Sequence, residues 1–353
     1  MKNRATIKDV AKEANVSPAT ISYVLNGKEN ISEGTKNRVY AVMKKLNYIP
    51  NLSARGLVNK NSKLIGVVVP QTEPGSNLIF DNSFYSEIIS SIEYEARNKG
   101  YHVIISATDA NESYFSLAKQ RNLDGIIVIG AYPNNFFEEV KKTQIPIVLV
   151  DSYFDDHYFH SIQINDRYGG YIATKYILEK GHRNIAIFTG TIKEGGVVKK
   201  RYDGYLDALR EYGLDPDPDY LFEGTVDYES GLNLAEKLAG LKSRITAVFC
   251  IADILAIGAI KGFYKKGIRV PEDISLVGFD DLAISKYIQP GLTTVHQNIS
   301  SKGEEAVRLL FNSMNGIQSG KQETILPISL VERESVKDVS NERGADIKNK
   351  PTL

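Results

Sequence analysis

The sequence of 353 residues has little of what marks a secreted or membrane-spanning protein. It contains one cysteine, Cys250, which has no partner for an intrachain disulfide and lies in an apolar run typical of a protein core. No run approaches the roughly 18 apolar residues needed to cross a bilayer. The N-terminal residues also lack the apolar stretch of a signal peptide. We therefore expect a cytoplasmic protein that does not contact a membrane.

Motifs for catalysis and for cofactors are also missing. His157 and His160 have a two-residue gap, but no Cys/His pair at metal-binding spacing accompanies them. The glycine-rich segment 190–196 lacks the Gly-Lys-Ser/Thr ending of a phosphate-binding loop. The sequence contains no Gly-x-Ser-x-Gly nucleophile motif and no acid/base pair that could be defended. It therefore predicts no catalytic residue, no metal site and no cofactor, and it favours a regulatory protein over an enzyme.

The formal net charge is zero, but the charges are unevenly distributed along the chain. Residues 1–60 hold eleven Lys or Arg and four Asp or Glu, an excess of seven positive charges that the rest of the chain balances. A compact basic segment suits a polyanionic partner, because neutralising phosphates releases counterions from nucleic acid. A solvated basic face is the alternative, so charge alone does not decide between them.

The first fifty residues have the pattern of three short helices. Thr6 is placed to cap a helix, and Asn15 tolerates the left-handed conformation of a sharp turn after it. Ser17 and Pro18 are typical of a second helix start, and Ser32 of a third. Two short helices across a tight turn, braced by a third, predict a helix-turn-helix unit that binds DNA. A helical protein-docking module is the alternative, which the basic charge disfavours.

Two stretches resemble the head and hinge of the lactose-repressor (LacI/GalR) family of transcriptional regulators: TIKDVAKEANVSPATISYVLN from Thr6 and LNYIPNLSARGL from Leu46. The resemblance implies that helix 17–26 enters the major groove and that residues 51–58 become a hinge helix on operator DNA. It also implies that Leu57 wedges into the minor groove and kinks the duplex; a buried linker residue is the alternative. The DNA-binding residues expected on this basis are Thr6, Ser17, Pro18, Ala19, Thr20, Ser22, Tyr23, Asn26, Lys36, Tyr48, Asn51, Ala54, Arg55 and Leu57.

One residue of the second helix departs from the family pattern. Tyr23 stands where many relatives carry an arginine, the commonest bidentate reader of guanine. Direct base readout should then depend on Ala19, Ser22 and Tyr23, so we expect an operator that differs from the usual family consensus. Phosphate contacts, which position the head without specifying sequence, are expected from Ser17, Thr20, Asn26 and Lys36.

From Leu64 onward short apolar runs alternate with amphipathic stretches, which predicts parallel sheets covered by helices. The resemblance extends over this body and implies a periplasmic-binding-protein-like fold of two parallel-sheet lobes with three crossovers. The expected architecture is thus an all-α helix-turn-helix head (1–49), a hinge (50–61), an α/β effector-binding and dimerisation body (62–334) and a polar tail (335–353). With crossovers near Ser161, Gly291 and Ile325, lobe one comprises 62–160 plus 291–324 and lobe two comprises 161–290 plus 325–334.

Ligands of such sheets bind beyond the carboxyl ends of the strands, where several polar side chains are expected. Asp151 and Asp280 end predicted strands, although Asp151 and Asp166 could be simple helix caps. Arg201 matches the Arg-x-x-Gly effector clamp of the family, and a fork of donors facing a carboxylate suits a polyhydroxylated ligand. By the resemblance, Asp253 caps a helix beside the cleft. The expected effector-binding residues are Phe84, Tyr85, Asp151, Asp166, Arg201, Asp253 and Asp280.

The sequence therefore predicts a homodimeric, sugar-responsive repressor of a carbohydrate-utilisation operon, which binds a palindromic operator in double-stranded DNA. Its effector is expected to be a sugar or sugar phosphate; Ala252 stands where many sugar-responding members carry an asparagine, so no relative's effector can be carried over. One alternative is a catabolite-control regulator whose corepressor is a phosphorylated carrier protein, docked around Ser300, Lys302 and Arg308. The other is a sugar-converting enzyme, which the lack of an acid/base pair disfavours. The tail has no leucine heptad, so a tetramerising coiled coil is not expected.

Overall fold

The computed structural model describes residues 5–25, 30–48, 61–70, 79–108, 121–130, 132, 134–153, 158–193, 195–241, 244–317 and 320–340. The chain divides into two compact units, Met1–Ser62 and Lys63–Leu353, each described here by itself. The predicted hinge, apart from its last residue, lies outside the described residues. The same holds for five of the expected DNA contacts: Asn26, Asn51, Ala54, Arg55 and Leu57.

The first unit, the head, contains three helices: α1 (Ile7–Glu13), α2 (Pro18–Leu25) and α3 (Glu33–Lys45). The capping box predicted at Thr6 is present, since Thr6 and Asp9 each bind the other's backbone N–H. Asn15 adopts the left-handed conformation expected between α1 and α2, with φ at 52°. Local sequence signals alone therefore place the start of α1 and the turn into α2.

The head has a small core of its own. Val10, Ala14, Ile21, Val24 and Val39 are buried together, at spacings that put each on the inner face of its helix. Side chains of α3 and of the segment after it pack partly against this core. The three helices therefore support one another without help from the body.

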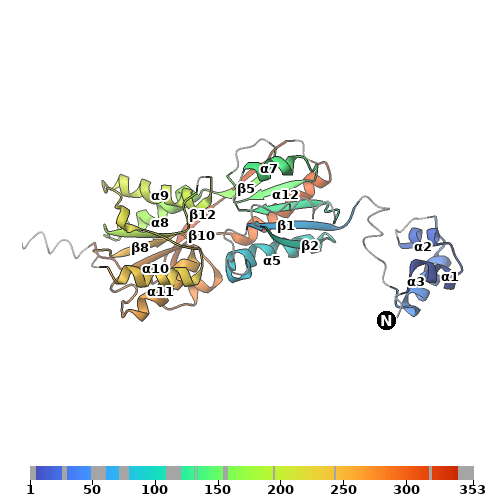
Figure 1. Ribbon diagram of the computed structural model, residues 1–353, viewed down its shortest axis with the longest axis horizontal. Coiled ribbons are helices and arrows are strands. Elements are labelled where there is room, and N and C mark those ends of the chain that lie inside the picture. Colours follow the sequence, from blue (N-terminus) through green and yellow to red (C-terminus); the bar gives the residue numbers. More distant parts are fainter. Residues whose placement is uncertain are drawn as a thin grey trace, which may run out of the picture. The chain divides into compact units, whose positions relative to one another are not determined.

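The body contains two sheets (Figure 1). The first comprises β1 (Leu64–Pro70), β2 (His102–Thr108), β3 (Gly125–Ile129), β4 (Ile147–Val150), β5 (His160–Ile164) and β11 (Glu323–Leu326). The second comprises β6 (Ile185–Thr189), β7 (Leu221–Glu223), β8 (Ala247–Cys250), β9 (Ser275–Asp280), β10 (Thr293–Gln297) and β12 (Ile328–Val331).

Strand order confirms two doubly wound lobes. The first sheet has the order β11-β5-β4-β3-β1-β2, and every neighbouring pair is parallel. The second has the order β12-β10-β9-β8-β6-β7, in which β12 alone runs antiparallel to its neighbour. That edge strand departs from the purely parallel expectation, because the chain re-enters the second lobe from the side on which β10 leaves it.

Helices cover both faces of each sheet. The first lobe has α5 (Ser83–Asn98) and α12 (Ile299–Met314) over one hydrophobic core and α7 (Asn134–Lys141) over another. In the second lobe, α8 (Asp166–Glu179) packs with α9 (Val197–Glu211), and α10 (Tyr228–Ala239) with α11 (Asp253–Lys265), on opposite faces of the sheet in Figure 1. Short 3₁₀ turns complete the body: η1 (Ile79–Asp81), η2 (Pro218–Tyr220) and η3 (Ala283–Lys286).

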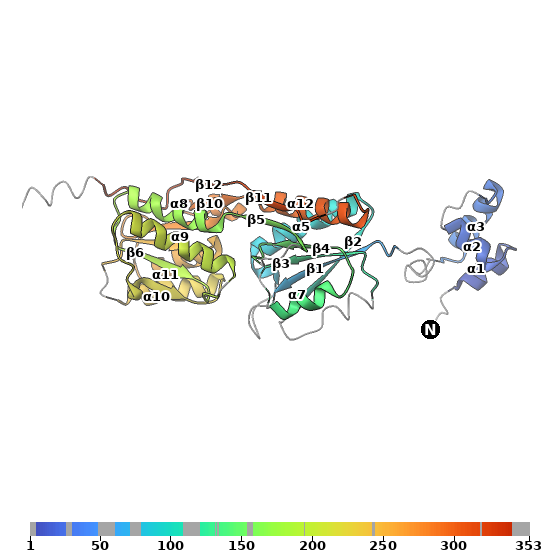
Figure 2. The same ribbon diagram turned by 90° about the horizontal axis from the view of Figure 1, so that it is seen from above.

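The three crossovers between the lobes occur later in the chain than the sequence predicted. β5 lies in the first sheet and β10 in the second, so the chain crosses at Asn165 and at Asn298, not near Ser161 and Gly291. The third crossover follows β11, at Pro327 (Figure 2). The apolar pattern could not show this, because a buried strand looks alike in either lobe. The marker is the helix start that follows, since Asn165 and Asn298 cap α8 and α12.

The segment expected to begin a polar tail instead packs on the second lobe. Ser335 is fully buried and its hydroxyl donates to the carbonyl of Leu276 and accepts from the amide of Thr293. Further on, the amide of Val339 binds the carbonyl of Lys180. Residues 335–340 therefore belong to the body, a correction that follows from backbone pairing rather than side-chain polarity. Among the residues described, no helix is long and apolar enough to cross a membrane.

Candidate functional site

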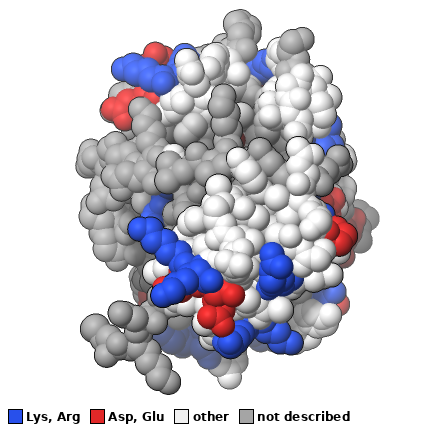
Figure 3. All heavy atoms as spheres, turned by 90° about the vertical axis from the view of Figure 1, so that its right-hand side faces the viewer, with Lys and Arg blue, Asp and Glu red and all other residues white. Residues whose placement is uncertain are grey.

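The second helix of the head presents an uncovered outer face. Pro18 and Ala19 are exposed, and Tyr23 has 43% of its surface accessible, whereas Ile21 and Val24 of the same helix are buried. Figure 3 shows, on the face turned to the viewer, a largely uncharged area with Lys and Arg side chains near its lower edge. An exposed helix edge on a segment with an excess of Lys and Arg has the shape and charge that a DNA groove requires.

Several of the expected DNA contacts already have partners within the head. Ser17 accepts a hydrogen bond from the amide of Thr20 at 3.1 Å, and the two hydroxyls lie 2.9 Å apart. Lys36 forms an exposed ion pair with Glu33 at 2.7 Å. Tyr48 packs partly against the core of the head. Thr6 hydrogen-bonds Asp9, so its hydroxyl has a structural role at the start of α1. Their roles on DNA stay predictions.

In the body, Arg201 on α9 lies at the centre of a group of buried charges. Its Nε donates to Asp166 Oδ1 at 2.7 Å, and its Nη1 donates to the carbonyl of Ile251 at 2.7 Å and to Asp280 Oδ1 at 3.4 Å. The guanidinium carbon lies over the ring of Phe279, 3.6 Å from the centroid. Arg201 is only 6% exposed, so this planar fork is fixed before any ligand arrives.

Glycines allow α8 and α9 to approach closely enough for this arrangement. A Cβ at Gly204 would lie 1.9 Å from the carbonyl oxygen of Arg167, and one at Gly170 would lie 2.1 Å from the carbonyl oxygen of Arg201. Any larger residue would push the helices apart. The Arg-x-x-Gly pattern therefore has a physical basis, because the glycine one turn after Arg201 sets the helix spacing that brings Arg201 to Asp166.

Asp166 links the two lobes. It opens α8 of the second lobe, and its Oδ2 accepts a hydrogen bond from the hydroxyl of Tyr153, a first-lobe residue, at 2.6 Å. Asn165, not Asp166, caps the helix, so the suggestion that Asp166 is merely a cap is wrong. Burial, and then the charge of Asp166, raises the pKa of Tyr153 above its ordinary range, which keeps its hydroxyl a donor.

Asp280 ends β9 in a strained conformation. Its φ is 114°, a region that non-glycine residues rarely adopt, and the next residue, Asp281, has φ at 55°. Gln297 Nε2 donates to Asp280 Oδ1 at 2.6 Å. Burial raises the pKa of Asp280 to about 6, although Arg201 and Gln297 favour its ionised form. Strain of this kind persists only where surrounding contacts hold it, and it is typical of ligand sites.

Asp151 and Lys302 form a buried ion pair in the first lobe. Asp151 follows β4 with φ at 55°, and Lys302 Nζ on α12 lies 2.5 Å from its Oδ1. Lys302 is 0% exposed. The prediction that Lys302 forms part of a phosphoprotein-docking surface is therefore wrong, because its ammonium points inward. The ion pair also shows that Asp151 is not a helix cap.

Phe84, which the sequence predicts to bind the effector together with Tyr85, lies beside this ion pair. Lys302 Nζ is 5.7 Å from the centroid of the Phe84 ring. Burial, and then the charges of Asp151 in the first lobe and Asp280 in the second, raises the pKa of Tyr85 to about 12. We call the combined group the interlobe cluster: Tyr85, Asp151, Tyr153 and Lys302 from the first lobe, with Asp166, Arg201, Asp280 and Gln297 from the second.

Asp253 does not have the predicted role. It is the first residue of α11, but the preceding Ala252 is the cap residue, and no side-chain cap bond is present. Its carboxylate accepts hydrogen bonds from the amide of Leu282 and the hydroxyls of Ser285 and Thr294, at 2.6 to 2.9 Å. It is 0% exposed, and burial raises its pKa to about 7. Asp253 thus supports the strand ends from behind and does not line the site.

Sequence reasoning missed three members of the interlobe cluster. Gln297 lies next to a crossover that was misplaced, and Tyr153 follows the end of β4 at a position that no motif marked, so nothing connected either residue to the site. Lys302 had a usable signal, because it falls on the apolar face of α12 between Ile299 and Ala306. A lysine at a position that helical spacing assigns to the core needs a buried partner.

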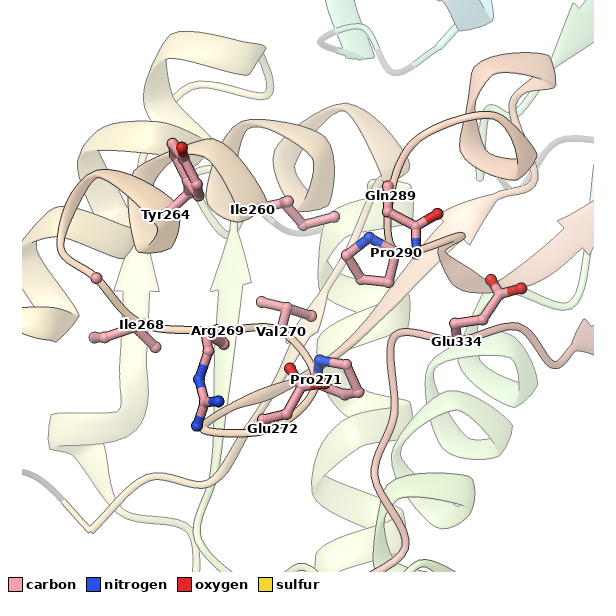
Figure 4. Close-up of a pocket in the computed structure, with 11 residues that line it drawn as sticks. Ile260, Tyr264, Ile268, Arg269, Val270, Pro271, Glu272, Gln289, Pro290 and Glu334 are labelled. Atoms are coloured by element: carbon pink, nitrogen blue, oxygen red, sulfur yellow. The ribbon is translucent and has the colours of Figure 1, made fainter.

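Two surface hollows lie apart from this cluster. One, of about 620 Å³, is at the opposite edge of the second sheet, where residues 267–272 precede β9 and Gln289 and Pro290 precede β10 (Figure 4). The other, of about 410 Å³, lies between α5 and α12. Neither combines buried charges of opposite sign, so we consider the interlobe cluster the better candidate for a ligand site. The described residues contain no group of His, Cys, Asp and Glu that could hold a metal ion.

Comparison with protein families gives two matches. Residues 6–51 match the model described as bacterial regulatory proteins, lacI family. Residues 174–336 match the periplasmic binding protein-like domain. The first match covers the helical head and the second covers most of the second lobe with α12.

Individual proteins are similar over nearly the whole chain. The HTH-type transcriptional repressor PurR of Pasteurella multocida (strain Pm70) is 35% identical over 339 residues, which is 94% of this chain and 99% of the relative. The lac repressor dimer bound to operator and the anti-inducer ONPF has a TM-score of 0.80 at 27% identity, covering 95% of this chain and all of that one. A complex of the transcriptional regulator CelR with cellobiose has a TM-score of 0.70 at 25% identity, covering 94% and 100%.

Proposed function

Because the chain belongs to the lacI family of bacterial regulatory proteins and is a DNA-binding transcriptional repressor, we propose that a sugar bound at its interlobe cluster controls operator binding. Its relatives are transcriptional regulators, not enzymes. The regulated genes are, on this proposal, a carbohydrate-utilisation operon. The observation that carries the proposal is the buried fork of Arg201 held between Asp166 and Asp280 at the strand ends.

The chemistry of the cluster supports a polyhydroxylated effector. Each hydroxyl of a sugar can donate one hydrogen bond and accept others. The cluster contains donors such as Arg201 and Tyr85 and acceptors such as Asp280 and Gln297, and the partly exposed ring of Phe84 lies beside Lys302. The structurally similar regulator CelR was solved with cellobiose. Sites that combine flat apolar surface with a few fixed polar groups are typical of small-molecule binding.

The position of the cluster supplies a mechanism for control. Tyr153 of the first lobe binds Asp166 of the second, and contacts of this kind set the arrangement of the two lobes. A ligand that contacts both lobes therefore competes with these contacts or reinforces them. An effector changes the arrangement only as far as its affinities for the two forms differ. A coupling free energy of about 1 to 3 kcal/mol would be typical. The effector thereby alters whether two heads can engage one operator.

The functional unit on this proposal is a homodimer. A palindromic operator presents two equivalent half-sites, and a twofold dimer offers two equivalent heads. The lac repressor to which the chain is similar was solved as a dimer bound to operator. We therefore propose that Ala19, Ser22 and Tyr23 of each head read bases in one half-site.

A catabolite-control role with a phosphoprotein corepressor has less support. Of the three residues expected at such a surface, Lys302 is buried and Arg308 forms an ion pair with Glu305 at 2.6 Å. The hollow between α5 and α12 is lined by three carboxylates and two cations: Glu95, Glu304, Glu305, Lys99 and Arg308. A phosphorylated partner would meet carboxylates there, so we do not favour this alternative.

A test combines operator selection with an effector screen. The full chain would be used to select duplexes from a random library, and a panel of sugars would be screened by thermal unfolding. A ligand at 100 times its Kd adds about 2.7 kcal/mol to stability, which is easily measured. We expect a palindromic duplex and a sugar that changes its affinity. If the stabilising sugar leaves operator affinity unchanged, the proposal of sugar control fails.

A further inference from the structure

The interlobe cluster contains two buried cations, and each is already bound to carboxylates. Lys302 lies 2.5 Å from Asp151, and its side chain has no exposed surface. Arg201 lies between Asp166 and Asp280, with side-chain exposures of 7%, 0% and 7%. Within this cluster three carboxylates therefore face two cations. No positive charge is left over for an anionic ligand.

Several acceptor atoms of the cluster have unused hydrogen-bonding capacity, and among the described residues Nη2 of Arg201 and the hydroxyl of Tyr85 are donors without a recorded partner. Gln297 Oε1 is buried and has no hydrogen-bond partner within the described part of the chain. The amide nitrogen of the same side chain donates to Asp280. The structure records no hydrogen bond to Oδ2 of Asp280 or of Asp151 from any residue it describes. A ligand that satisfies these atoms must bring N–H or O–H donors. Sugar hydroxyls do so, whereas a phosphate at neutral pH offers mainly acceptors.

We propose that the interlobe cluster accepts an uncharged, polyhydroxylated effector and excludes its phosphorylated form, and that Lys302 is the first-lobe residue that sets this selectivity. This inference rests on the proposed sugar control and narrows its ligand class. Lys302 is a positioning residue. It compensates the charge of Asp151 from behind, and it presents no ammonium to the ligand because it is fully buried. An anion placed among Asp151, Asp166 and Asp280 would be repelled at close range.

One cation lies at the edge of the cluster and serves as a control. Lys200 Nζ is 5.2 Å from the centroid of the Tyr153 ring and is only partly buried. An anion that bound at the edge would be expected to meet Lys200 rather than Lys302. Replacing each lysine by methionine therefore separates binding at the edge from binding inside the cluster.

The first experiment uses inorganic phosphate and the full chain. Thermal unfolding is followed in phosphate and in chloride at equal ionic strength. We expect no phosphate-specific stabilisation of the wild type. In Asp151→Asn, Lys302 stays buried but loses the carboxylate that compensates its charge, so we expect a Tm that rises with phosphate concentration, and this rise should disappear in the double variant Asp151→Asn with Lys302→Met. A purely structural role for Lys302 would not produce such a gain.

Two outcomes of this experiment would overturn the inference. The first is phosphate-specific stabilisation of the wild type. This result would overturn the inference regardless of whether Lys302→Met or Lys200→Met abolishes the stabilisation. The second is a folded Asp151→Asn variant that gains no phosphate dependence, because the ion pair would then not be what excludes the anion. Neither measurement requires a sugar or DNA. This inference can therefore fail while the proposal of sugar control stands, and sugar control can fail while this inference stands.

A second experiment needs no variant, so it holds even if Asp151→Asn does not fold. Free sugars and their phosphates are compared in matched pairs, glucose with glucose 6-phosphate and ribose with ribose 5-phosphate, by thermal shift and titration calorimetry. Among pairs that bind, we expect the free sugar to bind at least about tenfold more tightly, since like charges placed together in a binding site repel each other. A phosphate that binds as tightly as its free sugar would contradict the inference.

Discussion

The head and the interlobe cluster use charge in opposite ways. In the head, Lys36 pairs with Glu33 and Lys45 pairs with Glu13, and one or both partners of each pair are largely exposed. In the interlobe cluster, the ion pairs of Arg201 and Lys302 have at most 7% of either side chain exposed. The same chemical groups are therefore solvated in one unit and removed from water in the other.

This difference matches the two tasks. A surface ion pair contributes roughly 0 to 1 kcal/mol, so the cations of the head can exchange an acidic partner for a DNA phosphate at small cost. Removing one member of a buried pair costs about 3 to 5 kcal/mol, because the remaining charge is left uncompensated. A ligand that rearranges buried pairs can therefore shift the balance between lobe arrangements by more than contacts at the surface could.

The largest predicted effect comes from Arg201→Ala. The change leaves Asp166 and Asp280 buried without their shared cation, so the free energy of unfolding of the body should fall by about 3 to 5 kcal/mol. The matched control is Arg167→Ala on the neighbouring helix α8. Arg167 binds Asp207 through two hydrogen bonds but is largely exposed, so its loss should cost about 1 kcal/mol or less. Chemical denaturation of both variants measures the difference.

Arg201→Ala also tests control of DNA binding. At a temperature where the variant is folded, operator affinity should stay close to that of the wild type, while the response to the effector should be lost. Equal destabilisation by Arg201→Ala and Arg167→Ala would remove the contrast between buried and exposed charge. A variant that binds the effector normally would show that Arg201 is only structural.

A smaller effect is expected from the pH dependence of stability. Asp253 has its pKa raised to about 7 by burial, against an ordinary value of 3.8. Its contribution to stability is therefore complete below about pH 3.8 and is lost as the pH rises through 7. Asp253→Asn cannot ionise, so its stability relative to the wild type should improve by roughly 2 to 3 kcal/mol between pH 5 and pH 8. Denaturation at several pH values measures this trend.

The control for this pH trend is Asp273→Asn. Its exposed hydrogen bonds with Arg269 lower the pKa of Asp273 to about 2, so the carboxylate is ionised in both the folded and the unfolded chain from pH 5 to pH 8. The stability difference between this variant and the wild type should not vary over that interval. If the stability differences of the two variants from the wild type changed with pH in parallel, burial would not be what raises the pKa of Asp253.

The smallest effect is expected in the head. Tyr23→Ala removes one hydroxyl and an exposed ring from α2, which should weaken binding to the selected operator by about 1 kcal/mol, or roughly fivefold. Tyr40 on α3 is similarly exposed, at 50% against 43%, and its replacement by alanine should leave operator affinity unchanged. Fluorescence anisotropy with operator and with scrambled duplex separates the two. An equal loss on both duplexes would mean that Tyr23 contacts phosphate rather than bases.

Much of the fold could be predicted because its signals are local. The capping box at Thr6, the left-handed turn at Asn15 and the apolar strands each depend on residues that are only a few positions apart in the sequence. The crossovers could not be placed, because pairing between distant strands decides which sheet contains β5 or β10. Periodicity reports that a strand is buried but not which sheet it joins.

The residues of the candidate site likewise divide into those that local sequence signals mark and those whose place depends on packing. Asp151, Asp166, Arg201 and Asp280 were predicted because strand ends and a short motif mark them, and the structure brings them together. Asp253 has the same kind of position along the chain, yet its carboxylate turns to Ser285 and Thr294. Which way a side chain faces depends on packing that a sequence pattern does not contain. Lys302 was misassigned to the surface for the same reason.

The central claim is that a ligand at the interlobe cluster and DNA at the head are coupled. Titration calorimetry of the stabilising sugar, with the free protein and with its operator complex, tests it most directly. Thermodynamic linkage requires the operator to change sugar affinity by the same factor by which the sugar changes operator affinity, about 5- to 150-fold. Sugar affinity that is identical with and without operator would contradict the account.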